Sequence, residues 1–70
     1  MSLALQHFQR GVQHFNNGDY RSAVSELSNA IRLDPARPDY FMKRGDAHME
    51  LGDYEKSTAD YDQSNQIHTS

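Results

Sequence analysis

Histidines are the residues of this chain whose types and spacing come nearest to a chemical site. His7 and His14 stand two helical turns apart, so a helix would place both imidazoles on one face. A zinc site needs three or four converging ligands, and the sequence contains no cysteine and no His-Glu-x-x-His motif. We therefore expect no metal site in this chain.

Acidic side chains gather toward the C-terminal end, as Asp53, Glu55, Asp60 and Asp62. A helix-loop-helix calcium site needs a central glycine and a closing glutamate at fixed positions, and this stretch has neither. We interpret these carboxylates as the solvated polar face of a predicted helix. The glycines do not form a phosphate-binding loop either, because they are spaced regularly through the chain.

Catalytic patterns are missing as well. No nucleophile stands beside a plausible base, no pair of carboxylates marks a cleft, and no cofactor motif occurs. We therefore predict that the chain is not an enzyme and needs no cofactor. One alternative stays open, in which the chain is an accessory segment of a longer catalytic protein.

The charge of the chain limits its partners. Its net charge at pH 7 is -3, and the acidic excess lies in residues 36–70, which hold four basic and seven acidic side chains. Nucleic acids and anionic membranes need a basic surface, and the sequence has no basic stripe. Its apolar runs are too short for a spanning helix or a signal peptide. The lack of cysteine fits a reducing compartment, so the localisation stays open with the cytoplasm favoured.

Short motifs recur along the chain with one common offset of 34 residues. Arg10-Gly11, His14 and Gly18-Asp19-Tyr20 return as Arg44-Gly45, His48 and Gly52-Asp53-Tyr54. A repeat of this length indicates stacked structural units, each too small to bury its own apolar face. The repeat therefore predicts the architecture without support from any single motif.

Apolar spacing predicts two helices in each unit. The first helix ends at Asn17-Gly18, and the following helices are expected over residues 20–33, 38–51 and 54–67. Gly18 suits a left-handed C-cap and Asp19 the N-cap of the next helix. Asp34-Pro35 ends the second helix, and Pro38 fits the first turn of the third.

The period, the paired helices and the recurring motifs together resemble the tetratricopeptide repeat. The match runs through Gly11, Gly18, Tyr20, Ala23, Leu27, Ala30 and Pro35 in the first unit, and through Phe41, Gly45, Ala47, Gly52, Tyr54 and Tyr61 in the second. The resemblance implies one all-α domain over residues 1–70. Its two tandem helix-turn-helix repeats, at about 4–37 and 38–70, would arrange four antiparallel helices in a short right-handed α-solenoid.

The family resemblance also implies a concave groove lined by the first helix of each unit. The expected groove residues are Leu5, Phe8, Gln9, Val12 and Phe15 in the first unit, and Asp39, Met42, Lys43, Asp46, Met49 and Glu50 in the second. Aromatic and methionine-rich surfaces suit a partner helix or an extended peptide. We therefore predict a protein–protein interaction scaffold that binds a peptide or helix of a partner protein. The alternative interpretation of Phe8 and Phe15 as ordinary core residues stays open.

Several positions depart from the family pattern. Family members that grip chaperone C-terminal tails have lysine and asparagine where this chain has Phe8 and Val12, so the carboxylate clamp is absent and such tails are disfavoured. Lys43 and Arg44 remain candidates for pairing with an acidic ligand.

His14 and His48 stand where the family often buries an aromatic ring, so we expect both imidazoles to be partly buried. A buried imidazole is held neutral, so stability should fall below the unfolded pKa near 6.5. The difference in thermal stability between pH 7.5 and pH 5.5 should therefore shrink in His14→Phe.

The second helices of the two units differ in chemistry. Val24, Leu27 and Ile31 in the first become Thr58, Tyr61 and Asn65 in the second. A polar outer face is typical of the last helix of a stack, and the alternative that the sequence simply stops at this helix stays open. Because stable stacks usually have three or more repeats, two alternative functions stay open. The chain is then a self-associating structural unit, which is a possible homo-oligomer, or a regulatory segment of a larger protein.

Overall fold

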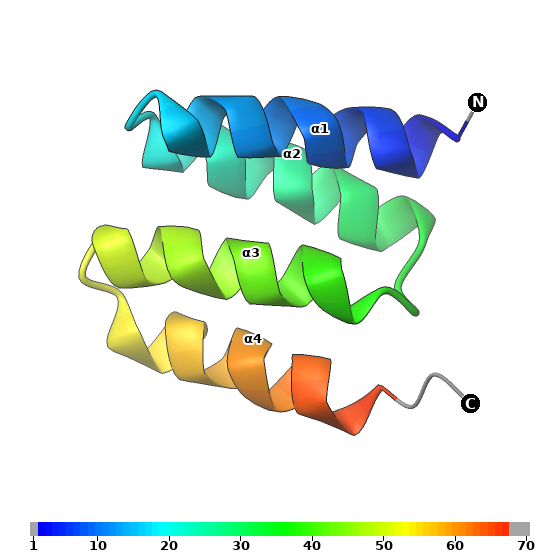
Figure 1. Ribbon diagram of the computed structural model, residues 1–70. Helices are drawn as coiled ribbons and strands as arrows, with labels where there is room; N and C mark the ends of the chain where they lie inside the picture. The colour runs from blue at the N-terminus through cyan, green and yellow to red at the C-terminus, as the bar shows by residue number, and fades with distance from the viewer. Residues whose placement is uncertain (1, 68–70) are drawn as a thin grey trace.

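The computed structural model describes residues 2–67 and contains four α-helices, shown in chain order in Figure 1. They are α1 (Leu3–Asn16), α2 (Tyr20–Leu33), α3 (Pro38–Glu50) and α4 (Tyr54–Gln66). No strand occurs in this part of the chain, so the predicted all-α repeat fold is confirmed. The last two helices each end one residue earlier than predicted, and residues 68–70 of the predicted second unit lie outside the described residues.

Each helical hairpin turns through glycine and aspartate, as the sequence predicts. Gly18 and Gly52 both have a φ of 80°, a left-handed conformation that glycine adopts without steric cost. Asp19 and Asp53 then each accept a hydrogen bond from the backbone N–H three residues later, at 3.2 and 3.3 Å. The repeated motif therefore builds the same turn twice.

The connection between the two units is short and held by one carboxylate. Asp34 is the C-cap of α2, and its side chain accepts hydrogen bonds from the Ala36 N–H at 3.4 Å and from Arg37 Nε at 3.2 Å. Pro38 follows as the first residue of α3, where its missing N–H leaves no helical bond unmade. This short junction therefore fixes the direction in which the chain leaves α2 and enters α3.

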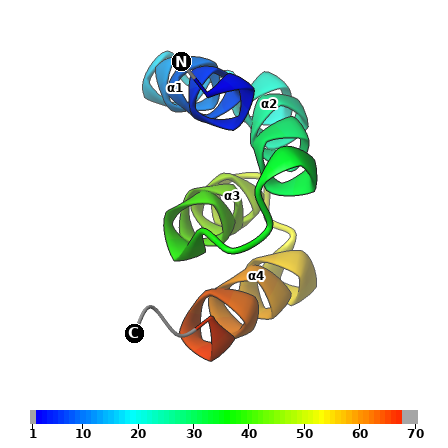
Figure 2. The ribbon, with the colours of Figure 1, turned by 90° about the vertical axis from the view of Figure 1, so that its right-hand side faces the viewer.

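The helices zigzag when they are viewed nearly end-on (Figure 2). α1 packs against α2, α2 against α3 and α3 against α4, whereas α1 touches α3 only slightly. Among residues 2–67, α4 contacts neither α1 nor α2. α1 and α3 therefore share one side of the molecule, and α2 and α4 share the other without touching. None of these helices has the length and apolarity needed to cross a membrane.

The core joins the two units. One buried cluster consists of Ala4, Ala30 and Tyr40, and another consists of Ala23, Leu27 and Ala47. Phe8 packs against both clusters. Because each cluster combines side chains of the first unit with one from α3, each unit depends on the other for burial of its apolar face.

An arginine in each first helix forms an ion pair with the second helix of the same unit. Arg10 Nε donates to Glu26 at 2.7 Å, and Arg44 donates through Nε and Nη2 to the two oxygens of Asp60, at 2.8 and 2.7 Å. Each arginine is thus matched by a carboxylate on the facing helix. Asp60 is buried, which makes its pair the more critical of the two.

The two histidines at the equivalent position differ in burial. His48 is only 9% exposed, whereas the side chain of His14 is 39% exposed and lies 3.8 Å from the Asp19 carboxylate. His14 is partly buried, as the sequence predicts, and its contribution to a pH-dependent stability stays a prediction. α2 and α4 flank His48, whose side chain lines both cavities between them.

Candidate functional site

α1 contributes an apolar strip to the side that it shares with α3. Leu5 is 40% exposed, Phe8, Val12 and Phe15 are half-buried, and Gln9 is exposed. Phe8 stacks on the ring of Tyr40 from α3, with 4.8 Å between the ring centroids. Phe8 and Phe15 pack on the core and still expose part of their surface, so their positions within the strip are fixed by the core.

Lys43 links the two helices on this side. Its Nζ lies 4.5 Å from the centroid of the Phe15 ring and 3.9 Å from the Asp46 carboxylate. Asp46 also accepts a hydrogen bond from the Tyr61 hydroxyl at 2.5 Å, which together with burial raises the pKa of Tyr61. Lys43 and Asp46 are therefore engaged within the protein, although the sequence predicts both as groove residues.

α3 adds methionines and free carboxylates. Met42 and Met49 are 49% and 42% exposed, and Asp39 and Glu50 are exposed with no hydrogen-bond or ion-pair partner among residues 2–67. We call the predicted groove residues together the α1/α3 face. It consists of Leu5, Phe8, Gln9, Val12, Phe15, Asp39, Met42, Lys43, Asp46, Met49 and Glu50.

The charges of the α1/α3 face do not favour an acidic ligand. Arg44 is held by Asp60 and also donates to Ser28 Oγ at 3.1 Å, while Lys43 lies over an aromatic ring. The unpaired charges left on this face are those of Asp39 and Glu50. The face is therefore apolar on α1 and combines exposed methionines with unpaired carboxylates on α3.

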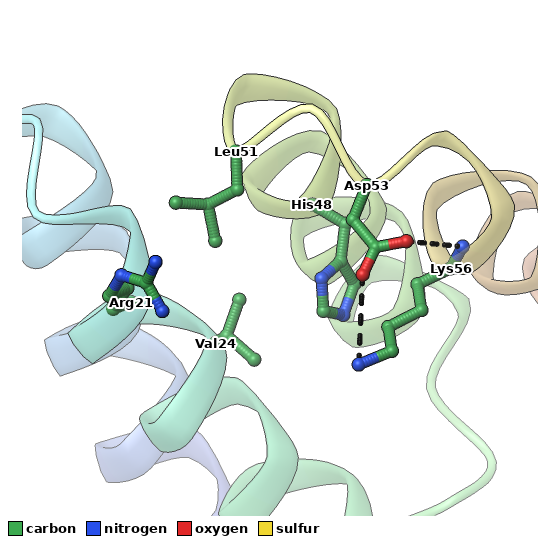
Figure 3. Close-up of a pocket in the computed structure, with 6 residues that line it drawn as sticks. All are labelled: Arg21, Val24, His48, Leu51, Asp53 and Lys56. Atoms are coloured by element: carbon green, nitrogen blue, oxygen red, sulfur yellow. Dashed lines mark hydrogen bonds and ion pairs between the residues drawn. The ribbon is translucent and has the colours of Figure 1, made fainter.

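A second hollow lies on the opposite side, where α2 and α4 fail to meet. Two adjoining cavities of about 300 and about 370 Å³ share Val24, His48 and Lys56 in their walls. We call them together the α2/α4 furrow. Figure 3 shows Arg21 and Val24 of α2 across the opening from His48 and Lys56, with Leu51 at one end. Neither Arg21 nor Lys56 is a predicted site residue.

Two cations and an imidazole give this furrow its electrostatic character. Lys56 Nζ lies 3.6 Å from the carboxylate of Asp53, whereas Arg21 has no ion-pair partner within residues 2–67. Burial lowers the pKa of His48, which is also lowered by Arg44 and Lys56 and raised by Asp60 and Asp53. His48 is therefore neutral at pH 7 and retains one N–H donor.

Metal ligands do not converge anywhere in the described part of the chain. No group of three or more histidine, cysteine, aspartate or glutamate side chains within residues 2–67 is placed to hold a metal ion. His7 is instead bound to Glu26, with its Nδ1 2.7 Å from the carboxylate. The two histidines that share a face of α1 thus have separate acidic neighbours, Glu26 and Asp19.

Sequence reasoning misses the α2/α4 furrow for a physical reason. Its walls come from three helices, and it exists because α2 and α4 are held apart by α3. Periodicity identifies which residues of one helix share a face, but it contains no measure of the space between two helices. The closest signal in the sequence is the polar residue His48 at a position where the family often has an aromatic side chain.

Comparison with protein families agrees with this geometry. A family model described as "TPR repeat" matches residues 11–52, and another described as "Tetratricopeptide repeat" matches residues 38–67. A search among curated proteins found no match. The first match spans the hairpin turn, α2, the junction and α3, and the second spans α3 and α4. The chain belongs to the tetratricopeptide repeat family.

Proposed function

We propose that the α1/α3 face binds a segment of another protein, and that this segment combines apolar with basic side chains. Tetratricopeptide repeats are generally protein–protein interaction modules and typically non-catalytic scaffolds. The observation that carries the proposal is the combination of exposed methionines with unpaired carboxylates along α3. The segment itself would be an extended peptide or one face of a helix.

The apolar part of the proposal rests on Leu5, Met42 and Met49. Each of these side chains is at least 40% exposed, and all three project from the two helices that share one side. Methionine adapts its shape to different apolar partners because its side chain is unbranched and flexible. The half-buried rings of Phe8 and Phe15 support the strip from beneath, since both pack on the core.

The charge part of the proposal rests on Asp39 and Glu50. They lie at opposite ends of α3, one in its first turn and one at its last residue, with both methionines between them. A partner segment with basic residues at both ends and apolar residues between them would therefore match the α1/α3 face in charge and polarity.

Removal of the methionine side chains tests the apolar contact. We expect Met42→Ala/Met49→Ala to weaken binding of an amphipathic lysine–leucine peptide about tenfold, because two half-exposed side chains lose burial in the complex. The measurement is isothermal titration calorimetry. Leu33→Ala is the matched control, since Leu33 is 46% exposed at the end of α2. Equal weakening by both variants contradicts the assignment of the face.

Reversal of the carboxylates tests the charge preference. Asp39→Lys/Glu50→Lys should lose affinity for the lysine–leucine peptide and gain affinity for a glutamate–leucine peptide of the same pattern. Glu55→Lys/Asp62→Lys changes the net charge equally on α4 and should leave the preference unchanged. If the two double variants behave alike, only the net charge of the chain matters and the proposed site is wrong.

A further inference from the structure

The α2/α4 furrow lies away from the face to which partner binding is assigned above. We propose that it is a second binding site, which takes a carboxylate carried on an aliphatic peptide side chain, with Arg21 as the cationic partner and His48 as a hydrogen-bond donor. This proposal does not depend on the function of the α1/α3 face. Its residues come from α2, α3 and α4, so the site exists only in the folded pair of repeats.

The furrow is a consequence of the packing order. α3 packs against both α2 and α4, while α2 and α4 do not contact each other within residues 2–67. α3 therefore forms the floor, through His48, and the flanking helices form the walls. The larger part of the opening, about 370 Å³, is lined by Ser28 and Asp60 in addition to the shared residues.

The charges in the furrow leave one cation without a partner. Lys56 is beside Asp53, and Arg44 is bound by both oxygens of Asp60. Arg21 faces the same cavity and makes no ion pair with residues 2–67. In a chain whose net charge is -3, this furrow therefore presents an uncompensated positive charge. A guest carboxylate would neutralise it.

The floor of the furrow holds an imidazole that makes no hydrogen bond within residues 2–67. His48 is 9% exposed, and Figure 3 shows its ring pointing into the cavity. Its nearest acidic neighbour is Asp60, but Nε2 and Oδ2 are 3.8 Å apart, which is too far for a hydrogen bond. Arg44 already occupies that carboxylate at 2.7 and 2.8 Å. A guest oxygen in the cavity would supply the missing acceptor for the imidazole N–H.

The walls also contain apolar side chains, which indicate the kind of side chain that would carry the carboxylate. Val24 lines both cavities and Leu51 is 40% exposed at the end of the first. These side chains would contact methylene groups. A glutamate flanked by leucine therefore suits the furrow better than a free inorganic anion, because it combines the charge with aliphatic surface.

Two blocked peptides test the proposal by nuclear magnetic resonance. The ¹⁵N-labelled chain is titrated with acetyl-Leu-Glu-Leu-amide and with acetyl-Leu-Gln-Leu-amide, which differ in charge but not in shape. We expect the glutamate peptide to shift the amide signals of Arg21, Val24, His48 and Lys56 and to bind about threefold more tightly at low salt. Blocked ends exclude binding of a terminal carboxylate. Equal affinity of the two peptides, or shifts confined to α1 and α3, overturns the proposal.

Two arginine variants assign the charge. Arg21→Gln should abolish the preference for glutamate, whereas Arg32→Gln should keep it, because Arg32 is an exposed residue at the other end of α2 that donates to Asn29. Both changes alter the net charge equally. A preference that persists in Arg21→Gln, or that disappears in both variants, shows that the carboxylate is not bound at Arg21.

A histidine variant assigns the donor. His48→Leu should weaken the glutamate peptide by a similar factor, since the apolar replacement fills the position without an N–H. Circular dichroism establishes that the variant is folded before titration. If His48→Leu binds the peptide as tightly as the parent chain, His48 is not the donor. If the His48→Leu variant does not fold, His48→Gln replaces it, because glutamine keeps a side-chain N–H; this variant must then bind the peptide for the assignment to stand.

Discussion

Ser57 shows at the scale of a single residue how the second unit differs from the first. It occupies the place of Ala23, and both side chains are fully buried. The Ser57 hydroxyl makes no hydrogen bond within residues 2–67. The neighbouring Tyr61 hydroxyl donates to Asp46; the Ser57 hydroxyl lies close enough to lower the Tyr61 pKa, against the larger effect of Asp46, but it does not reach the geometry of a hydrogen bond. A buried hydroxyl without a partner lowers stability because it has lost its water.

Ser57→Ala should therefore stabilise the chain by about 1 kcal/mol, because it removes an unsatisfied hydroxyl without opening a large cavity. Urea unfolding followed by circular dichroism gives the free energy of unfolding. The reverse change at the equivalent position, Ala23→Ser, should destabilise by about 1–3 kcal/mol. A destabilised Ser57→Ala variant contradicts the absence of a partner for this hydroxyl.

His48 makes the stability of the chain depend on pH. Burial lowers its pKa in the folded state below the ordinary value of 6.5, with Arg44 and Lys56 adding to the shift while Asp60 and Asp53 oppose it; Arg21 faces it from α2. The unfolded chain therefore binds a proton more readily as the pH falls below about 6.5. The contribution of neutral His48 is present above that pH and is lost as the pH falls toward the folded pKa.

We expect the melting temperature to be lower at pH 5.5 than at pH 7.5, and the difference to shrink in His48→Gln, which does not titrate. His14→Gln is the matched control from the equivalent position, where the side chain is 39% exposed. Carboxylates titrate below this window, so the comparison isolates the histidines. An unchanged difference in His48→Gln means that the pH dependence comes from another group.

At the scale of the helices, the glycine at the eighth position of each unit determines how closely the two helices of that unit pack. A Cβ on Gly11 would lie 2.8 Å from Leu27 Cγ, and a Cβ on Gly45 would lie 2.8 Å from Tyr61 Cε1. The small residue lets the second helix of each unit approach the first. The two collisions differ, because Leu27 is fully buried while Tyr61 is half-buried and meets the added atom with the outer part of its ring.

Gly11→Ala should therefore cost about 1–3 kcal/mol of unfolding free energy, since Leu27 has no room to move. Gly45→Ala should cost less, because the half-buried Tyr61 ring can turn about its own axis and keep its hydroxyl at Asp46. The better helix propensity of alanine offsets about 1 kcal/mol in both variants. Urea unfolding of the two variants measures the difference. A larger cost for Gly45→Ala contradicts the inferred freedom of Tyr61.

Arg44 acts at the scale of elements because it joins three helices, from α3 to Asp60 on α4 and to Ser28 on α2. Arg44→Met should cost about 3–5 kcal/mol, because buried Asp60 would lose its counter-charge. Arg10→Met removes the equivalent arginine, which is half exposed, and should cost less than about 1 kcal/mol. Arg44→Met/Asp60→Leu should recover most of the loss. Thermal unfolding of the three variants gives the order, and equal losses in both single variants contradict it.

At the scale of the whole molecule, the outer surface of α4 bears on self-association. Positions that are covered by α3 in the first unit, such as Val24 and Ile31, are Thr58 and Asn65 in the second, where they are exposed. Tyr61 is tied to Asp46, and Tyr54 is the large apolar side chain left exposed on α4. Such a polar face gains little free energy from covering.

We therefore expect the chain to be a monomer of 8.0 kDa across a wide range of concentrations. Sedimentation equilibrium measures the mass directly. A mass that rises with concentration contradicts this expectation and supports the alternative of a self-associating unit. In that case Tyr54→Lys should restore the monomer, because it places a charge on the exposed apolar ring.

Local rules were enough to predict the helices and their turns. Gly18 and Asp19 specify their turn through backbone conformation and one side-chain hydrogen bond, both of which depend on neighbours in sequence. Pro38 specifies the start of α3 for the same reason. The 34-residue offset then predicts the stack, because two units with the same pattern must pack in the same way.

The amino-acid sequence by itself determined the family and the four helices, since these follow from periods and motifs along one chain. The residues of the α1/α3 face come from the family resemblance, and their role in binding stays a prediction. Only the tertiary structure decided that Lys43 and Asp46 are engaged, that His48 rather than His14 is buried, and that a furrow separates α2 from α4. Burial and pairing depend on distances between helices. Those distances are set by the sizes of side chains that meet from different parts of the chain, such as Leu27 on Gly11.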